Sequence, residues 1–201
     1  VVDEIFNGIP DWVYEEEILS TNVAMYDSPD GSRLAFARFD DQLVHKFTYT
    51  KFGPPNDPYG HQYPNEIELR YPKSGTKNPT FQLKVASLAD PLEPHRVIEP
   101  PAEVIAFGDY IYTRVSWITD DRLSVIWKNR VQNKAVITEC TENDSVKYTC
   151  TVLSTQTEPD GWLEPANAPL YKSSGSQMVQ IRPLKNTADN LNYPHIALLT
   201  S

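Results

Sequence analysis

Short runs in which apolar and polar residues alternate dominate this chain and predict β-strands. Alternation of this kind places every second side chain on one face of a sheet. The clearest runs are residues 33–39, 80–85, 122–127, 135–138 and 148–153. Turn residues such as Ser28-Pro29-Asp30-Gly31 separate the runs, and long helical periodicity is hard to find. The pattern predicts an all-β fold of antiparallel strands.

A degenerate repeat organises these strands. Residues 26–36 are echoed by residues 115–125, and residues 170–179 form a weaker copy. Each copy has an aromatic or apolar opening, a polar turn and then an apolar strand. Repeats of about 40–50 residues with this content are typical of β-propeller blades, so we expect about three antiparallel blades of a partial propeller. The first interval is about double that period, which predicts an insertion at residues 45–72.

The insertion is predicted to be a long hairpin arm. Strand-like runs at residues 46–50 and 66–70 flank residues 51–64, which are rich in proline and glycine and break both helix and strand patterns. An exposed loop rich in tyrosine, phenylalanine and proline fits a contact surface. The alternative is a mobile surface excursion without a partner.

Composition narrows the possible functions. The chain has 201 residues, of which 40% are hydrophobic and 22% charged, so bulk disorder is excluded. No apolar stretch approaches the roughly 20 residues of a transmembrane helix, and no signal peptide opens the chain. Because Val1 is not a start methionine, we expect a processed, truncated or excised chain. A net charge of −9 disfavours nucleic acid as a partner and would help to attract cationic peptide N-termini, although it equally serves solubility.

Catalytic and cofactor motifs are absent from the sequence. There is no Gly-x-Ser-x-Gly nucleophile elbow, phosphate-binding glycine loop or dinucleotide fingerprint. The four histidines are dispersed without metal-ligand spacing, so we expect neither a metal nor a cofactor. The carboxylate pairs Asp40-Asp41 and Asp120-Asp121 fall where β-turns are expected, which gives acid/base catalysis little support. We therefore expect no catalytic residue in this chain.

Two cysteines flank a polar turn. Cys140 and Cys150 lie on either side of residues 141–149, between apolar-rich runs. A pair facing across a hairpin can meet disulfide geometry, and closing a loop of about ten residues would stabilise the fold by roughly 2–3 kcal/mol. The same turn carries the glycosylation sequon Asn143-Asp144-Ser145. The alternative is two free core thiols beside a chance sequon.

The run Asp11-Trp12-Val13-Tyr14-Glu15-Glu16-Glu17 is the main candidate for a binding site. Three consecutive carboxylates repel one another, and the two aromatic residues beside them argue against a simple solvated tail. We expect a short helical turn here, on which Glu16 and Glu17 could approach one cation from two sides while Glu15 points elsewhere. A free α-amino group suits such a site, since it is cationic below a pKa of about 8 and has three N–H donors. The alternative is a charge run on a wet surface.

The acidic run and several later blocks resemble the dipeptidyl peptidase IV family. The resemblance covers roughly residues 3–162 and becomes thin beyond Trp162. The blocks that carry it are residues 7–17, 28–36, 71–75, 78–80, 115–117 and 127–133. Members are extracellular or membrane-anchored serine exopeptidases that remove dipeptides, with proline or alanine second, from free N-termini. They combine an eight-bladed β-propeller with an α/β-hydrolase domain.

The resemblance implies roles for individual residues. All of residues 1–201 would belong to one propeller domain, with no hydrolase domain present. Glu16 and Glu17 would bind the α-ammonium of the substrate, with Trp12 and Tyr14 as supporting structure. The arm at residues 45–72 would contribute to a homodimer.

The resemblance also bears on the cysteines and on where the protein acts. Family members pair the cysteines of this hairpin, which implies a Cys140–Cys150 disulfide and an oxidising, extracellular location, with Asn143 as a glycosylation site. The chain would act as a secreted protein or as a cell-surface ectodomain.

The sequence also departs from the family's motifs at two places. A family arginine would precede this segment, and Leu163 follows Gly161-Trp162 where members have a Phe-Arg pair. Catalytically inactive relatives that modulate potassium channels keep the acidic string, so a protein-interaction ectodomain is the alternative function. A short secreted interaction module is a third.

Overall fold

Strands dominate the computed structural model of the protein, as the alternating pattern predicts. The structure describes residues 4–53, 63–90, 92–144, 146–164, 168–172, 177–189 and 191–200. Within these ranges the strands form a nine-stranded, a three-stranded and a two-stranded sheet. The prediction of an all-β fold is confirmed, and two short helices are the described exceptions.

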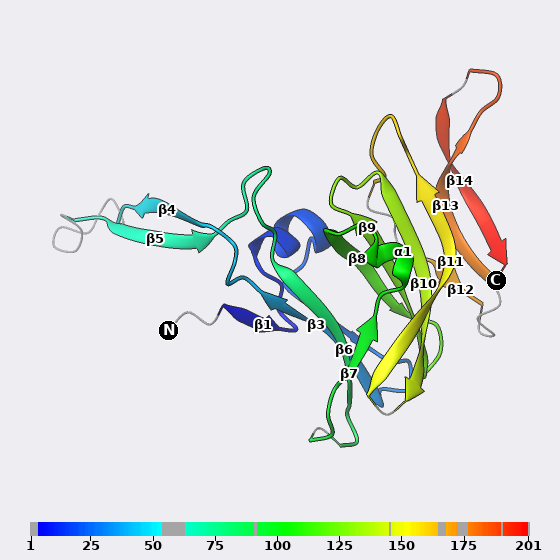
Figure 1. Ribbon diagram of the computed structural model, residues 1–201, viewed down its shortest axis with the longest axis horizontal. Coiled ribbons are helices and arrows are strands. Elements are labelled where there is room, and N and C mark those ends of the chain that lie inside the picture. Colours follow the sequence, from blue (N-terminus) through cyan, green and yellow to red (C-terminus); the bar gives the residue numbers. More distant parts are fainter. Residues whose placement is uncertain are drawn as a thin grey trace.

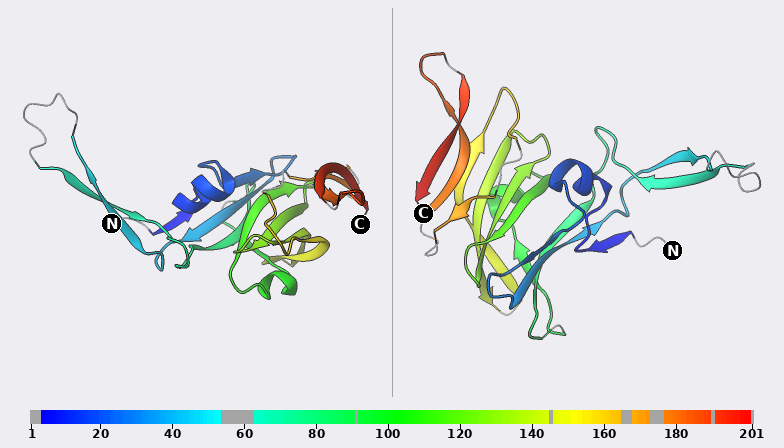
Figure 2. Two further views of the ribbon diagram at one scale, coloured as in Figure 1. Left: turned by 90° about the horizontal axis from the view of Figure 1, so that it is seen from above. Right: turned by 180° about the vertical axis from the view of Figure 1, so that it is seen from behind.

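The largest sheet curls on itself rather than lying flat (Figure 1; Figure 2). Its strands are β1 (Ile5–Asn7), β2 (Met25–Asp27), β3 (Arg33–Asp40), β6 (Thr80–Ser87), β7 (Arg96–Glu99), β8 (Tyr110–Trp117), β9 (Arg122–Asn129), β10 (Lys134–Asp144) and β11 (Lys147–Thr157). They follow the order β1-β3-β6-β7-β11-β10-β9-β8, and β2 also pairs with β3. At the open side of the curl, the Trp117 indole N–H of β8 donates to the Tyr26 carbonyl of β2 at 2.8 Å.

The sheet consists of two antiparallel groups joined at one place. Strands β1, β2, β3, β6 and β7 form the first group, and β8 to β11 form the second. A short parallel pairing between β7 and β11, from Lys147 opposite Val97 to Thr149 opposite Glu99, joins them. The third group is the separate sheet of β12 (Leu170–Tyr171), β13 (Gln177–Lys185) and β14 (Asn192–Thr200). These three groups are what the repeat predicts as blades.

Two hydrophobic cores hold the groups together. The main core lies inside the curl and includes the fully buried Phe39, Tyr112 and Trp127. A smaller core of Ile126, Ile137 and Met178 packs the three-stranded sheet onto β9 and β10. The third group is therefore fixed to the outside of the second.

The predicted arm is present as the two-stranded sheet. Strands β4 (Lys46–Lys51) and β5 (Asn65–Arg70) form an antiparallel hairpin that projects from the rest of the molecule (Figure 1; Figure 2). All six side chains of β4 are exposed. The part of the predicted arm at residues 54–62 lies outside the described residues, as do residues 173–176 of the third repeat copy.

The edge strand next to β3 is interrupted, and the acidic run lies in the interruption. β1 pairs with residues 38–40 of β3, and β2 pairs with residues 34–36. Between them the chain leaves the sheet at Gly8 and returns at Ala24, whose N–H donates to the Gly8 carbonyl at 2.9 Å. Both residues also bond to Ala37 of β3. The base of the excursion is thus closed by backbone hydrogen bonds.

Glycine is required where the excursion leaves the sheet. Gly8 has a φ of 72°, a left-handed conformation that residues with a Cβ rarely adopt. A Cβ at this position would lie 2.8 Å from Cγ of Met25. Conformation and space therefore both favour glycine here.

Gly8→Ala should therefore destabilise the fold by about 1–3 kcal/mol, through backbone strain and displacement of Met25. Thermal unfolding monitored by circular dichroism measures the loss. Gly31→Ala is the matched control, since Gly31 has a φ of 70° with open space around it. An equal loss in both variants would show that the Met25 contact contributes nothing.

Candidate functional site

The acidic run lies on a helical turn, as the sequence predicts. The turn begins at Trp12 and continues as the π-helix η1 (Tyr14–Leu19). In a π-helix, residues five positions apart lie on one face, and Tyr14 and Leu19 are both buried. Short π-helical turns are rare and frequently occur at functional sites. Helix η1 lies between the arm and the nine-stranded sheet (Figure 1; Figure 2).

The three glutamates lie in the first turn of this helix. Glu16 and Glu17 are exposed, whereas Glu15 is half-buried. Among the described residues, none donates a hydrogen bond to Glu16 or Glu17 or forms an ion pair with either. Ionised carboxylates are acceptors only, and two adjacent negative charges repel. The pair is therefore free to bind an external cation with N–H donors.

Asp11 fixes the start of the helix. Its Oδ2 accepts a hydrogen bond from the Val13 N–H at 3.0 Å, and its Oδ1 accepts one from the Tyr14 N–H at 3.2 Å. The Asp11 carbonyl accepts a third, from the Glu15 N–H at 2.8 Å. An aspartate in this position satisfies backbone donors and favourably meets the positive end of the helix dipole. The acidic turn therefore has a defined first residue.

Tyr14 anchors the turn to the nine-stranded sheet. Its ring lies 4.7 Å from that of Phe39 in β3, 5.4 Å from Tyr112 in β8 and 5.7 Å from Phe81 in β6. Burial raises the pKa of Tyr14 well above its usual value, so the ring is neutral throughout the physiological range. The helix is therefore packed against both antiparallel groups of the sheet at once.

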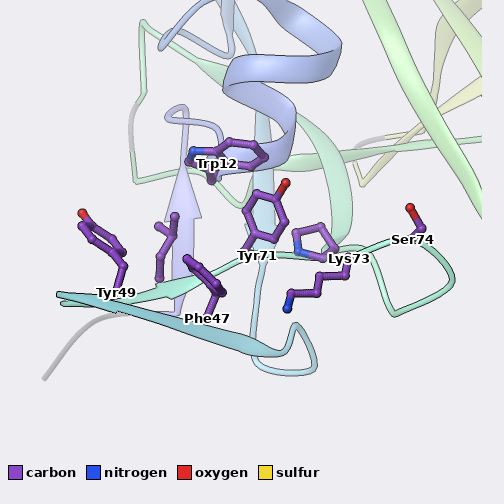
Figure 3. A pocket seen from close by; sticks show the side chains of 8 residues that line it. Trp12, Phe47, Tyr49, Tyr71, Lys73 and Ser74 are labelled. Atoms are coloured by element: carbon purple, nitrogen blue, oxygen red, sulfur yellow. The ribbon is translucent and has the colours of Figure 1, made fainter. Parts of the chain in front are cut away.

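An aromatic pocket opens beside the helix at the base of the arm (Figure 3). Trp12 lies over the ring of Tyr71 at 4.5 Å, and Phe47 lies 6.0 Å from the same tyrosine. The Lys73 ammonium stands 5.3 Å from the centre of the Phe47 ring. The pocket has a volume of about 740 Å³. Tyr49 of β4 extends this surface along the arm (Figure 3).

A second cavity, of about 320 Å³, contains two buried carboxyl groups. Asp11 and Asp41 both line it, and each is only 3% exposed. Burial raises the pKa of Asp11 to about 6, although the hydrogen bonds from the Val13 and Tyr14 amides lower it. Burial and the charge on Asp11 raise the pKa of Asp41 to about 7. Oδ1 of Asp41 is buried and has no hydrogen-bond partner among the described residues.

The predicted disulfide is present. Cys140 of β10 and Cys150 of β11 lie directly opposite each other and are bonded, with their Cα atoms 4.0 Å apart. Asn143 is exposed near the tip of the same hairpin. Ser145, the last residue of the sequon, lies outside the described residues.

Metal-binding and membrane-spanning features were sought in the same ranges. The described residues contain no group of three or more histidine, cysteine, aspartate or glutamate side chains that could hold a metal ion. None of the helices described is long and apolar enough to cross a membrane.

The arrangement of the strands recurs in two solved structures. Dipeptidyl peptidase 4 from Porphyromonas gingivalis superposes with a TM-score of 0.74 over 98% of this chain and 25% of its own, at 23% identity. A putative dipeptidyl aminopeptidase IV from Bacteroides ovatus gives 0.75 over 100% of this chain and 25% of its own, at 18% identity. The fold is therefore a partial β-propeller of this class.

Sequence comparison gives the family. Residues 2–201 match the model of the dipeptidyl peptidase IV N-terminal region, and the chain belongs to this family. It is 43% identical to venom dipeptidyl peptidase 4 of Apis mellifera over 85% of this chain. It is 40% identical to prolyl endopeptidase FAP of Bos taurus over 69% of this chain, and 35% identical to inactive dipeptidyl peptidase 10 of Mus musculus over 96%. The chain covers 21%, 17% and 23% of these relatives' lengths, respectively.

The sequence located some parts of this site and missed others. It placed the glutamates on a helical turn with Trp12 and Tyr14 beside them. It treated Asp40-Asp41 as an ordinary turn, and the chain does turn there, since the Val44 N–H donates to the Asp41 carbonyl at 2.9 Å. However, the Asp41 side chain is buried, which nothing in its neighbours along the sequence indicates. The pocket between Trp12 and Tyr71 was missed as well, because it depends on packing between distant segments.

The raised pKa values predict how stability depends on pH. The folded protein retains protons that the unfolded chain releases above a pH of about 4, so stability falls as pH rises toward about 7. Asp41→Asn removes one ionisation with little change of shape. It should stabilise the protein by an amount that grows over this interval and levels off above it, at roughly 2–4 kcal/mol.

Thermal unfolding of wild type and Asp41→Asn at about pH 5 and about pH 8 measures this difference. Glu103→Gln, an exposed glutamate of helix α1 (Ala102–Ile105), controls for loss of one negative charge and should show little change at either pH. A stability difference for Asp41→Asn that is the same at both pH values would contradict the assignment.

Proposed function

We propose that this chain is the substrate-docking part of the propeller of a serine-type dipeptidyl peptidase. The whole of residues 1–201 belongs to that single propeller domain, and the catalytic serine, histidine and aspartate lie in a hydrolase domain elsewhere in the polypeptide. The enzyme removes X-Pro and X-Ala dipeptides from free N-termini. Glu16 and Glu17 bind the α-ammonium of the substrate.

The observation that carries this proposal is a pair of free carboxylates on a fixed support. Glu16 and Glu17 are exposed and have no described partner, while Tyr14 on the opposite face of the turn is fully buried. An ammonium has three N–H donors and can bind both carboxylates by charge-assisted hydrogen bonds. The turn does not need to reorganise to present them.

A fixed docking point explains how an enzyme of this kind would select dipeptides. If the ammonium is held at a constant distance from the nucleophile, the second peptide bond of the substrate is the one presented for cleavage. A blocked or uncharged N-terminus leaves the carboxylates unpaired and is rejected. Asp11 and Tyr14 support this selection because they fix the position of the turn.

Glu16→Gln and Glu17→Gln in the polypeptide that carries both domains should each lower kcat/KM for an X-Pro substrate by about 10²–10³, because a charge-assisted contact is lost. Initial-rate kinetics with a chromogenic X-Pro substrate measure the loss. The double variant should lose less than the product of the single effects, since both residues bind one ammonium.

Two controls sharpen this experiment. Glu103→Gln removes an exposed helical glutamate away from the acidic turn and should retain wild-type kinetics. The wild type should also discriminate against the N-acetylated form of the same substrate. Wild-type kcat/KM in both Glu16→Gln and Glu17→Gln would refute the docking role.

The alternative function is a catalytically inactive ectodomain that acts as a protein-interaction module. The 35% identity to inactive dipeptidyl peptidase 10 supports it, since the match covers 96% of this chain. Absence of dipeptidyl peptidase activity in the wild-type polypeptide, with a protein partner bound instead, would favour this alternative.

The arm supports homodimerisation in either case. Phe47, Tyr49, Phe52 and Tyr63 are large hydrophobic residues of the arm at residues 45–72, and their exposed fractions range from 40% to 85%. Aromatic residues are enriched at protein interfaces. A second copy of the protein is the partner that we propose for this surface.

Phe52→Ser combined with Tyr63→Ser should shift the protein from dimer toward monomer, because two exposed aromatic contacts are removed. Sedimentation equilibrium measures the change in dissociation constant, which should rise by at least about tenfold. Thr50→Ser, at an exposed position of the same arm, is the control. An unchanged dissociation constant in the double variant would exclude this part of the arm from the interface.

An extracellular location fits the same proposal. The Cys140–Cys150 disulfide is stable in oxidising compartments, and a relative at 43% identity is a venom enzyme. We expect a glycan on Asn143, which lies exposed beside that disulfide. Intact-mass comparison of wild type and Asn143→Gln, expressed through a secretory pathway, tests for it.

A further inference from the structure

The cavity beneath the acidic turn contains charges that the docking role does not use. Asp11 closes the first turn of the helix, and Asp41 directly follows β3. The Asp41 N–H donates to the carbonyl of Glu4, just before β1, at 2.8 Å. Both carboxyl groups line the same cavity and both are 97% buried. Two such groups in one poorly solvated space cannot easily both be ionised.

Nearby cations do not neutralise the two carboxyl groups. Arg70 of β5 forms an ion pair with Glu4 and donates to the Val44 carbonyl. Lys46 of β4 donates to Glu68 of β5 at 2.7 Å. Among the described residues, neither cation forms an ion pair with either buried aspartate.

The remaining charged groups around the cavity are negative. Glu15 of the helix lines it, and Asp40 stands at the end of β3 beside Asp41. The charge of Glu15 acts on Asp11, and the charge of Asp40 acts on Asp41, in each case against ionisation. A single proton is therefore the simplest means of reducing the repulsion.

We propose that Asp11 and Asp41 are positioning residues that retain one proton between them, carried by Asp41, and that loss of this proton displaces the docking helix and weakens binding of an N-terminal ammonium. This inference rests on the proposed function of Glu16 and Glu17. Ionised Asp11 is the member that accepts the hydrogen bonds of the Val13 and Tyr14 amides. Asp41, whose Oδ1 has no described partner, is the member that carries the proton.

The displacement follows from where the second charge appears. When Asp41 ionises, its charge repels that of Asp11, and burial of both groups strengthens the repulsion. The side-chain hydrogen bonds of Asp11 go to the two amides that begin the helix, so moving Asp11 loosens that end of the turn. Glu16 and Glu17 lie within the next six residues. The pH window is centred on the pKa of about 7 for Asp41, since Asp11, with a pKa of about 6, ionises at lower pH.

The test measures binding without catalysis. Calorimetric titration of the full polypeptide with the dipeptide Ala-Pro gives its Kd between about pH 6 and about pH 7.5, where the dipeptide amine (pKa about 8) remains mostly charged. The wild-type Kd should rise about fivefold across this range. Asp41→Asn cannot ionise and should show a Kd that is constant over the same range. Glu103→Gln should follow the wild type.

Two replacements of Asp11 separate its hydrogen bonding from its charge. Asp11→Asn retains an acceptor for the helix amides and should bind Ala-Pro without the pH dependence. Asp11→Ala has no acceptor and should bind weakly at every pH.

Hydrogen exchange of the Val13 and Tyr14 amides provides a readout independent of the ligand. In the wild type it should accelerate with pH more than intrinsic exchange does, and in Asp41→Asn it should follow intrinsic exchange.

The possible failures are distinguishable. If Glu16→Gln and Glu17→Gln bind Ala-Pro as the wild type does, the proposed docking function fails. If those two variants lose affinity but Asp41→Asn keeps the wild-type pH dependence of Kd and of amide exchange, the docking function stands and the role of the retained proton is refuted.

Discussion

Burial of Tyr14 in the aromatic core is the interaction on which the candidate site depends. A helix as short as η1 is unstable alone in water, because few hydrogen bonds offset the cost of its nucleation. Its position must therefore come from tertiary contacts. The Tyr14 ring packs against rings from β3, β6 and β8, and each such pair contributes about 0.5–1.5 kcal/mol beyond the burial of area. Asp11 adds a second constraint, because its carboxylate accepts hydrogen bonds from the Val13 and Tyr14 amides at the start of the helix.

Strand β3 organises the features around the site. The acidic turn interrupts the edge strand that pairs with it, and the arm follows its C-terminal end. The aromatic pocket and the carboxyl cavity both lie between these two excursions and share Trp12 and Leu69. The acidic turn, an arm with exposed aromatic residues and a pair of buried carboxyl groups are thus attached to one strand.

Local features of the fold were predictable from the sequence, and long-range features were not. Alternation of apolar and polar residues located β3, β6, β9, β10 and β11, because the period of a half-buried strand is visible in the chain itself. The interval between the first two copies of the repeat located the arm, because an insertion of this size about doubles the spacing. The π-helical geometry of η1, the burial of Asp41 and the contact of Trp12 with Tyr71 depend on segments that meet only in the folded state. Asp41 has the sequence neighbours of a solvated turn residue, so only the structure reveals its carboxyl group as unusual.

The central claim is that two adjacent carboxylates on a rigid turn bind the charged end of a peptide. A crystal structure of the polypeptide with a bound X-Pro dipeptide tests it most directly. The account predicts the dipeptide nitrogen within about 3 Å of a carboxylate oxygen of both Glu16 and Glu17, with η1 unchanged in position. A dipeptide whose nitrogen lies away from both carboxylates, on any other group of the protein, would contradict it.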